Sequence, residues 1–258
     1  MLALFTRLAL DAGRAIMEVF HGAIDVEEKA DSSPVTAADR ASEALILEGL
    51  RAAYPGVPCV AEEEASAGIL PVALDGPFFL VDPLDGTREF VRRRRDFTVN
   101  IALVRDGAPA VGIVYAPARG ELYTGRPGHA EAAETDAAGC LANVRQIHAR
   151  KGAPPFTIVA SRSHMDEETL AYIRRFDASE LVSVGSSVKF CLIAEAGADL
   201  YPRFGRTMEW DTAAGDAVLR AAGGITVTLD GAPLVYGKQA GGFANPPFIA
   251  CGAITPPL

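Results

Sequence analysis

The chain has few cysteines, little basic charge and no long apolar run. Its four cysteines form no Cys-x-x-Cys pair, so we expect buried free thiols of a reducing compartment. Lys and Arg total 24 against 33 Asp and Glu, a net charge of −9 that argues against broad binding of nucleic-acid polymers. Charges interrupt the first 20 residues, so we expect neither a transmembrane segment nor a signal peptide. We therefore expect a cytoplasmic protein, and a peripheral contact with the inner face of the membrane stays open.

Several catalytic signatures are also missing. The sequence contains no G-x-G-x-x-G, H-E-x-x-H or G-x-S-x-G, the patterns of dinucleotide-binding folds, zinc metalloproteases and α/β-hydrolases. An S-x-x-K pattern is present at residues 186–189, but its companions S-D-N and K-T-G are absent. This argues against an acyl-serine mechanism.

The composition is that of a globular protein of one or two domains, with 49% hydrophobic residues in 258. Helical spacing of apolar residues predicts a helix over the first 20 residues and another over 37–53, which a Tyr-Pro-Gly sequence ends. Residues 78–82 predict a buried strand that stops at Pro83. Residues 97–104 and 108–117 flank Asp106-Gly107 and predict a hairpin, with a third strand at ELYTG.

The pattern changes near residue 150, after a stretch rich in Ala, Gly and Pro. Strands at FTIVAS, LVSVG and ADLYPRF alternate with helices over 166–176, 186–197 and 212–222. We therefore predict two domains, 1–150 with helices over an antiparallel sheet and 151–258 as a smaller α/β unit.

Carboxylates form the most informative pattern. FFLVDPLDGT places Asp82 at the end of a strand and Asp85 three residues later, so the turn can aim both side chains and the Leu84 carbonyl at one point. Upstream, VAEEEA offers Glu62 and its two neighbours, and downstream Asp211 comes just before a predicted helix. Oxygen ligands without His or Cys suit Mg²⁺ better than zinc, and two or more ions would form a clamp for phosphoryl displacement.

Each of these residues has an ordinary structural interpretation as well. Asp82 and Asp85 could be turn residues, and the Glu run could be a solvated surface. Asp211 could cap a helix, and Asp39 fits a capping box with Thr36. Only the combination favours a metal site.

That combination resembles the superfamily of lithium-sensitive, Mg²⁺-dependent phosphatases that includes the inositol monophosphatases. The resemblance runs from KADSSPVTAAD through AEEE, DPLDGTREF, FTVNIALV and SRSH to GSSVKFCLIAEAGADLYPRFG and WDTAAGDAV. The last two segments are most similar to the bacterial 3′(2′),5′-bisphosphate nucleotidases. The resemblance implies a layered α/β sandwich like that of fructose-1,6-bisphosphatase, consistent with the α+β and α/β halves.

The resemblance also implies roles for individual residues. Two or three Mg²⁺ ions would be held by Glu62, Asp82, the Leu84 carbonyl, Asp85 and Asp211. Thr87, oriented by Asp39, would position and deprotonate the attacking water. The third Glu in Ala61-Glu62-Glu63-Glu64 leaves the register open, so Glu63 could share or take the ligand role. The positions implied to contact substrate are Gly86, Thr87, His164, Ser186, Lys189, Arg203 and Asp211.

The expected activity is hydrolysis of the 3′-phosphate of adenosine 3′,5′-bisphosphate, with its sulfated analogue PAPS as a second substrate, by direct attack of water. The close alternative is an inositol or sugar monophosphatase of the same superfamily. More distant alternatives are an aspartyl-phosphate enzyme of the haloacid dehalogenase type, which the D-x-x-D spacing argues against, and a non-catalytic phosphate sensor. The sequence is compatible with a monomer or a homodimer.

Overall fold

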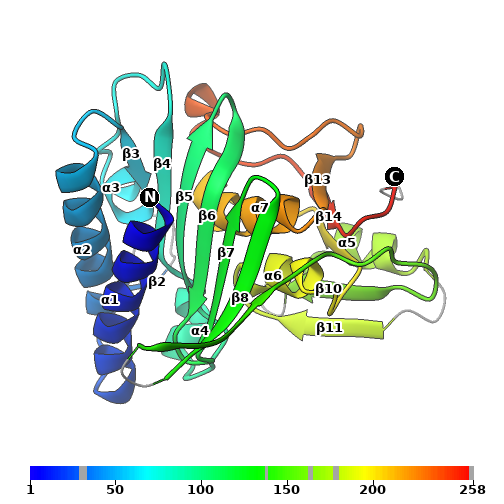
Figure 1. Cartoon of the computed structure of the whole chain (residues 1–258), viewed down its shortest axis with the longest axis horizontal. Helices are drawn as coiled ribbons and strands as arrows, with labels where there is room; N and C mark the ends of the chain where they lie inside the picture. Colours follow the sequence, from blue (N-terminus) through cyan, green and yellow to red (C-terminus); the bar gives the residue numbers. More distant parts are fainter. Residues whose placement is uncertain (29–33, 137–138, 162–164, 177–179, 256–258) are drawn as a thin grey trace.

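Within the described residues, two large β-sheets, one two-stranded ribbon and seven α-helices make up the fold (Figure 1). The computed structural model describes residues 1–28, 34–136, 139–161, 165–176 and 180–255. The larger sheet has the order β3-β4-β5-β6-β7-β8-β9, the smaller one β11-β10-β12-β14-β13, and β1 pairs with β2. The strands of the larger sheet are β3 (Cys59–Ala61), β4 (Phe78–Asp85), β5 (Thr98–Arg105), β6 (Ala108–Ala116), β7 (Glu121–Arg126), β8 (His129–Thr135) and β9 (Leu141–Gln146). The others are β1 (Val26–Glu28), β2 (Pro34–Thr36), β10 (Thr157–Ser161), β11 (Glu180–Val184), β12 (Leu200–Arg203), β13 (Ile225–Thr228) and β14 (Phe248–Cys251).

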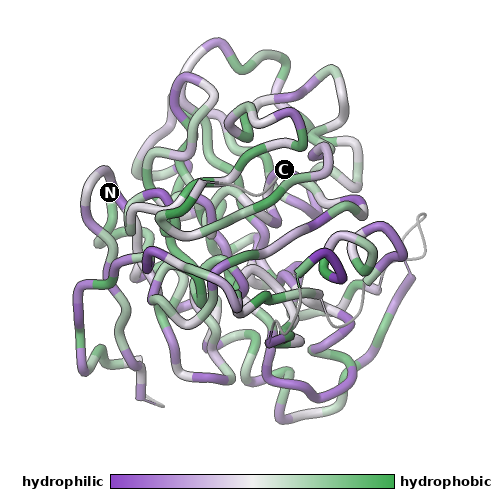
Figure 2. The backbone as a smooth tube through the Cα atoms, turned by 90° about the vertical axis from the view of Figure 1, so that its right-hand side faces the viewer, coloured by the Kyte–Doolittle hydropathy of each residue, from purple (hydrophilic) through white to green (hydrophobic). Residues whose placement is uncertain are grey.

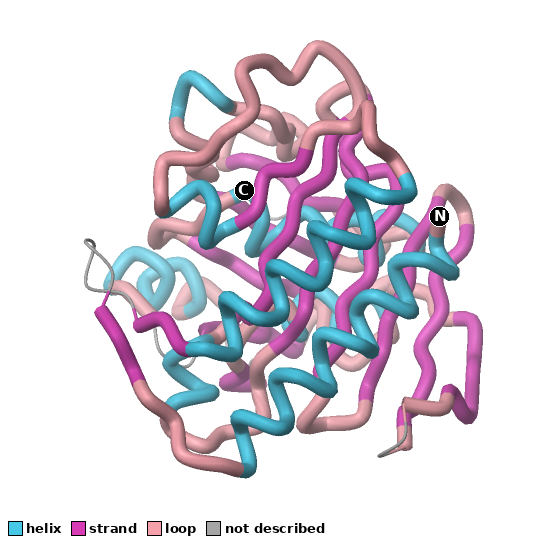
Figure 3. Tube along the Cα trace, turned by 90° about the vertical axis from the view of Figure 1, so that its left-hand side faces the viewer, coloured by secondary structure: helices cyan, strands magenta, loops and turns pink. Residues whose placement is uncertain are grey.

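The helices and sheets alternate in layers. One face of the larger sheet is covered by α1 and α2, which lie side by side across its strands (Figure 3). Its other face packs on α7 and α6, which also contact the smaller sheet, and α5 covers the far face of that sheet. The helices are α1 (Leu2–His21), α2 (Ala37–Ala53), α3 (Glu62–Ser66), α4 (Thr87–Val91), α5 (Glu167–Ile173), α6 (Val188–Ala194) and α7 (Glu209–Ala221).

Strand β4 shows why the central strands read as continuous apolar runs. Successive side chains of a strand point to opposite faces of its sheet. Phe79 and Val81 pack under α1 and α2, whereas Phe78 and Leu80 pack in the cluster that contains α7. Because both faces are covered, four successive apolar residues, FFLV, open the strand before Asp82. Figure 2 shows the hydropathy of each residue along the backbone.

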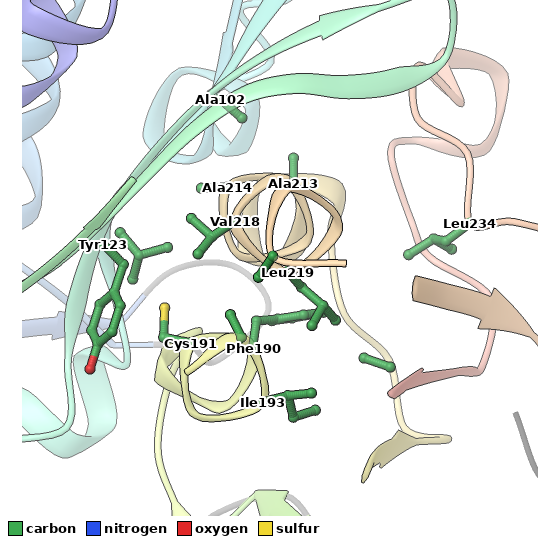
Figure 4. Packing of buried hydrophobic residues seen from close by; sticks show 14 of the residues in the cluster. Ala102, Tyr123, Phe190, Cys191, Ile193, Ala213, Ala214, Val218, Leu219 and Leu234 are labelled. Atoms are coloured by element: carbon green, nitrogen blue, oxygen red, sulfur yellow. The ribbon is translucent and has the colours of Figure 1, made fainter. Parts of the chain in front are cut away.

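Two glycines let α7 approach the larger sheet closely. A Cβ at Gly112 on β6 would lie 2.5 Å from the Ala214 carbonyl oxygen, and one at Gly125 on β7 would lie 2.6 Å from the Val218 Cα. Figure 4 shows Ala213, Ala214, Val218 and Leu219 of α7 among the buried side chains between the layers. This packing fixes α7, which starts two residues before Asp211.

The predicted layered α/β sandwich is confirmed, with differences in detail. Strand β4 does not stop at Pro83: it continues to Asp85, with an irregular register between Asp82 and Asp85. The weakly periodic stretch before residue 150 contains two further strands, β8 and β9. The proposed boundary falls between β9 and β10, and the division into two domains stays a prediction, since α7 packs on the sheet of the first half. No helix in the described ranges is long and apolar enough to cross a bilayer.

Candidate active site

The D-P-L-D segment lies at the irregular end of β4. Asp82 pairs in register with Asn100 on β5 and Asp85 pairs with Thr98, so the two intervening residues bulge out of the ladder. The Leu84 N–H donates to Asp82 Oδ1 at 3.0 Å, which stabilises the turn. Asp82 is 1% exposed, and both aspartates line one cavity. These aspartates can therefore shape the turn and act as cation ligands at the same time.

Glu62 reaches the same cavity from α3. Strands β3 and β4 are parallel neighbours, so the residues that follow them emerge at one edge of the sheet. Glu62 follows β3 directly and lines the cavity, whereas Glu64 pairs with Arg51 at 2.7 Å. Of the three consecutive glutamates, Glu62 alone is part of the cavity wall formed by the described residues.

Asp211 completes the acidic group from the first turn of α7. It does not precede the helix as the sequence suggested, but is its third residue, and its Oδ2 accepts the Met208 N–H at 2.8 Å. It therefore caps the helix and lines the cavity at once.

Burial and mutual repulsion raise the pKa values of these carboxyls. The pKa of Asp82 lies well above its usual range, first because of burial and then because of the charges on Glu62, Asp85 and Asp211. The pKa of Asp211 is raised in the same way. Burial raises the pKa of Asp85 to about 6, although the nearby Lys189 ammonium opposes the shift. Such a group is costly to keep ionised without cations.

The donor set fits a hard divalent cation. Four carboxylates and the Leu84 carbonyl offer oxygen ligands only, as Mg²⁺ prefers. Among the described residues, no three His, Cys, Asp or Glu side chains already stand close enough to enclose an ion. Burial and the charges of the neighbouring carboxylates raise the pKa values of Asp82 and Asp211, and a bound divalent cation would offset this cost.

Thr87 and Asp39 meet beside this acidic group. Asp39 is 1% exposed on α2, and its Oδ2 accepts the Thr36 N–H at 2.7 Å and the Thr36 hydroxyl at 2.6 Å. Its Oδ1 lies 3.1 Å from the Thr87 hydroxyl, which is also 3.1 Å from the Leu84 carbonyl. A hydroxyl has one proton to donate, so a cation on the Leu84 carbonyl would leave that proton to Asp39. Burial raises the pKa of Asp39 above its ordinary value, and the hydrogen bonds from Thr36 oppose the shift.

Gly86 makes this turn possible. It has φ of +93°, a left-handed conformation that glycine adopts without strain, and it precedes α4. A Cβ there would also lie 3.0 Å from the Asp96 carbonyl oxygen. Thr87 therefore follows a turn that only glycine fits.

Basic and hydroxyl groups line another part of the cavity. Lys189 is 4% exposed, donates to the Ser186 carbonyl and has its Nζ 5.1 Å from the Tyr201 ring centroid. Burial lowers the pKa of Lys189 to about 8, while Asp85 opposes the shift. Arg203 on β12 is 7% exposed, and its Nη2 donates to the Arg206 carbonyl at 2.9 Å. The Ser186 hydroxyl is buried and has no hydrogen-bond partner among the described residues, and the residue has φ of +52°.

The cavity joins these two groups of residues in about 670 Å³. All predicted site residues that the structure describes line this cavity, except Asp39, which is hydrogen-bonded to the wall residue Thr87. His164 lies outside the described residues. Sequence reasoning assigned no role to several wall residues, among them Glu89, Arg206, Met208, Trp210 and Phe243. Glu89 and Trp210 lie inside the segments DPLDGTREF and WDTAAGDAV, whereas no motif marks the other three.

Comparisons with known proteins agree with this geometry. A model of the inositol monophosphatase family matches residues 1–254. The 3′(2′),5′-bisphosphate nucleotidase CysQ of Escherichia coli K12 is 45% identical over 244 residues, which cover 94% of this chain and 96% of that protein. The CysQ of Buchnera aphidicola is 40% identical, over 92% and 87% of the two chains.

Solved structures are similar over the same length. The crystal structure of CysQ from Bacteroides thetaiotaomicron, a bacterial member of the inositol monophosphatase family, has a TM-score of 0.77 and 35% identity, covering 95% of this chain and 94% of that one. The Thermotoga maritima IMPase has a TM-score of 0.78 at 23% identity, covering 98% and 92%, and so supports the fold alone.

Proposed function

The chain belongs to the inositol monophosphatase family, and we propose that it is a Mg²⁺-dependent phosphatase that removes the 3′-phosphate of adenosine 3′,5′-bisphosphate. PAPS is the proposed second substrate. The observation that carries the proposal is that one cavity holds an acidic group of four carboxylates together with the buried cations Lys189 and Arg203. The nucleotidase names of the 45% and 40% identical relatives support the substrate class.

Glu62, Asp82, Asp85, Asp211 and the Leu84 carbonyl would hold two or three Mg²⁺ ions. When bound, these ions neutralise the phosphate dianion and make water more acidic. The protein's own part is to keep several buried carboxylates at one edge of the sheet, where β3, β4 and α7 end or begin.

Thr87 and Asp39 would orient the attacking water and take its proton. The Thr87 hydroxyl donates to Asp39 and so presents its lone pairs to a water hydrogen. Asp39 is held on its other oxygen by Thr36, and its raised pKa makes the carboxylate a better proton acceptor.

Lys189, Arg203 and Ser186 would bind the phosphate that is not cleaved. Buried cations pair strongly with phosphate oxygens, and Arg does so with directed donors. The Ser186 hydroxyl supplies a further donor that has no partner among the described residues. A monophosphate would leave these groups unused, which favours the bisphosphate over inositol 1-phosphate.

We also propose a cytoplasmic location, because Cys59, Cys191 and Cys251 are buried as free thiols, the form kept in a reducing compartment. The expectation of buried thiols was wrong for Cys140, which is exposed.

The test is phosphate release from adenosine 3′,5′-bisphosphate, PAPS and inositol 1-phosphate, each with and without Mg²⁺. We expect Mg²⁺-dependent release with the highest kcat/KM for a bisphosphorylated nucleotide. Lys189→Met should raise KM for that substrate, while the control Lys151→Met, at an exposed lysine, should not. Preference for inositol 1-phosphate would support the alternative, and no release from any substrate would support a sensor.

A further inference from the structure

One face of α2 contacts three separate segments of the active site. Asp39, Ser42 and Glu43 are spaced i, i+3 and i+4, so their side chains lie on the same face of the helix, and all three are buried. Asp39 accepts a hydrogen bond from the Thr87 hydroxyl, and Ser42 Oγ lies 3.5 Å from the Pro83 carbonyl oxygen. Glu43 reaches the third segment, the first turn of α3.

Both oxygens of the Glu43 carboxylate accept hydrogen bonds from the first turn of α3. Its Oε2 accepts the Glu63 N–H at 2.8 Å and its Oε1 accepts the Glu64 N–H at 2.9 Å. These are N–H groups of a helix's first turn, which have no partner inside the helix. The residue before α3 is Ala61, which makes no side-chain cap, so Glu43 supplies what the local sequence lacks.

Helix α3 depends on such contacts for its position. It has five residues, none of them buried, and so short a helix is not stable by itself. Its first residue is Glu62, whose carboxylate lines the acidic part of the cavity. The direction of Glu62 therefore depends on what holds the next two backbone N–H groups.

We propose that Glu43 is a positioning residue that holds α3 so that Glu62 faces the cation site. This inference rests on the proposed Mg²⁺-dependent function. Residues behind metal ligands commonly change metal affinity 10- to 100-fold when they are replaced. Loss of Glu43 should act on Glu62 in this way and leave the other three carboxylates in place.

The chain offers a matched control on the same two helices. Arg51 of α2 pairs with Glu64 of α3 at 2.7 Å; the Arg51 side chain is exposed, the Glu64 side chain is partly buried, and neither residue lines the cavity that Glu62 lines. Exposed pairs contribute little to stability. Arg51→Gln therefore removes an α2–α3 contact without removing the cap.

The experiment is titration calorimetry of the full chain with Mg²⁺, well below the unfolding temperature. Glu43→Gln keeps one acceptor oxygen but turns an NH₂ group toward the other N–H, and Glu43→Ala removes both acceptors. We expect Mg²⁺ binding about 10-fold weaker in Glu43→Gln and up to about 100-fold weaker in Glu43→Ala, with Arg51→Gln unchanged. Raising Mg²⁺ should restore kcat in Glu43→Gln, which a general loss of structure would not allow.

Unchanged Mg²⁺ affinity in Glu43→Gln, with only a lower melting temperature, would overturn the inference and leave a purely structural cap. Different results would contradict the proposed function itself: no Mg²⁺ binding by the wild-type chain, or equal Mg²⁺ affinity in Asp82→Asn and wild type. Glu43→Gln is close in shape to Glu and keeps the test decisive where Glu43→Ala does not fold.

Discussion

Replacing Asp82 by Asn should stabilise the metal-free protein and abolish its activity. Asp82 is almost fully buried among Glu62, Asp85 and Asp211, and its pKa is raised well above the ordinary value by burial and by those charges. Asn has the same shape and keeps the oxygen that accepts the Leu84 N–H. The substitution therefore removes a repelling charge at little structural cost, but it also removes a cation ligand.

The size of the effect follows from simple electrostatics. Two unit charges about 4 Å apart repel by about 4 kcal/mol at an effective dielectric constant of about 20, a value that also describes buried sites in proteins. Because the native acidic group relieves part of this by taking up protons, we expect metal-free Asp82→Asn to gain about 1 to 3 kcal/mol near pH 8. For a chain of this size that is a rise in melting temperature of about 3 to 10 °C.

The gain should depend on pH in a defined direction. A carboxyl with a raised folded-state pKa destabilises the native state above that pKa, and the penalty disappears as the pH falls toward the unfolded-state pKa. The advantage of Asp82→Asn should therefore shrink from pH 8 to pH 5. The wild-type chain without metal should itself become more stable over this range, to the extent that the raised pKa values of Asp82, Asp85 and Asp211 govern its stability.

The assay is thermal unfolding after treatment with EDTA, and again with saturating Mg²⁺, beside phosphate release. Asp106→Asn, at an exposed aspartate of the β5–β6 turn, is the control and should change neither. Wild type should gain stability with Mg²⁺, and Asp82→Asn should gain much less and lose at least about 100-fold in rate. A metal-free Asp82→Asn less stable than wild type, or one that hydrolyses substrate at close to the wild-type rate, would refute the reasoning.

Three further predictions concern the water-positioning pair, the thiols and the packing of α7. Thr87→Ala should lower kcat about 10²- to 10⁴-fold with Mg²⁺ affinity unchanged by calorimetry, and Thr87→Ser should keep most activity; a full-rate Thr87→Ala would remove the hydroxyl from the mechanism. In the native protein at pH 8 the exposed Cys140 should react with an aromatic disulfide reagent. Cys59 should react only after unfolding, because burial raises its pKa to about 11. Labelling of native Cys140→Ser at the wild-type rate would contradict this. Gly125→Ala should cost about 1 to 3 kcal/mol in chemical denaturation, because its Cβ would meet the backbone of α7, whereas Gly56→Ala has open space; equal stabilities would show that α7 is not so closely packed.

Local signals explain which elements the sequence predicted well. Helix α2 spans residues 37–53 as predicted, because Thr36 and Asp39 form a capping box and Tyr54-Pro55-Gly56 ends it. The hairpin β5–β6 turns at Asp106-Gly107 for a similar reason. Strand β9 was missed because all six of its residues are exposed, so it shows no alternation of apolar and polar positions.

Long-range packing accounts for the errors. The prediction that Pro83 ends a strand was wrong, because β5 pairs again with Asp85 beyond the bulge. Nothing near α7 in the sequence shows that it packs on the larger sheet, since the residues that permit it, Gly112 and Gly125, lie about 90 to 100 positions earlier.

The site residues also divide into those marked by local sequence and those brought in by long-range packing. The motif residues Asp82, Asp85 and Thr87 could be located from local sequence, and their roles stay proposals. Phe243 reaches the cavity from a loop without a motif. The signal for Glu43 was its spacing of four from Asp39, which becomes meaningful only once α3 is seen to lie against α2.

Anomalous diffraction from crystals soaked in Mn²⁺, used in place of Mg²⁺, tests the central claim most directly. We predict two or three peaks inside the cavity, bounded by the oxygens of Glu62, Asp82, Asp85 and Asp211 and the Leu84 carbonyl. An empty cavity in crystals that bind Mn²⁺ elsewhere, or carboxylates turned away from one another in the soaked form, would contradict the account.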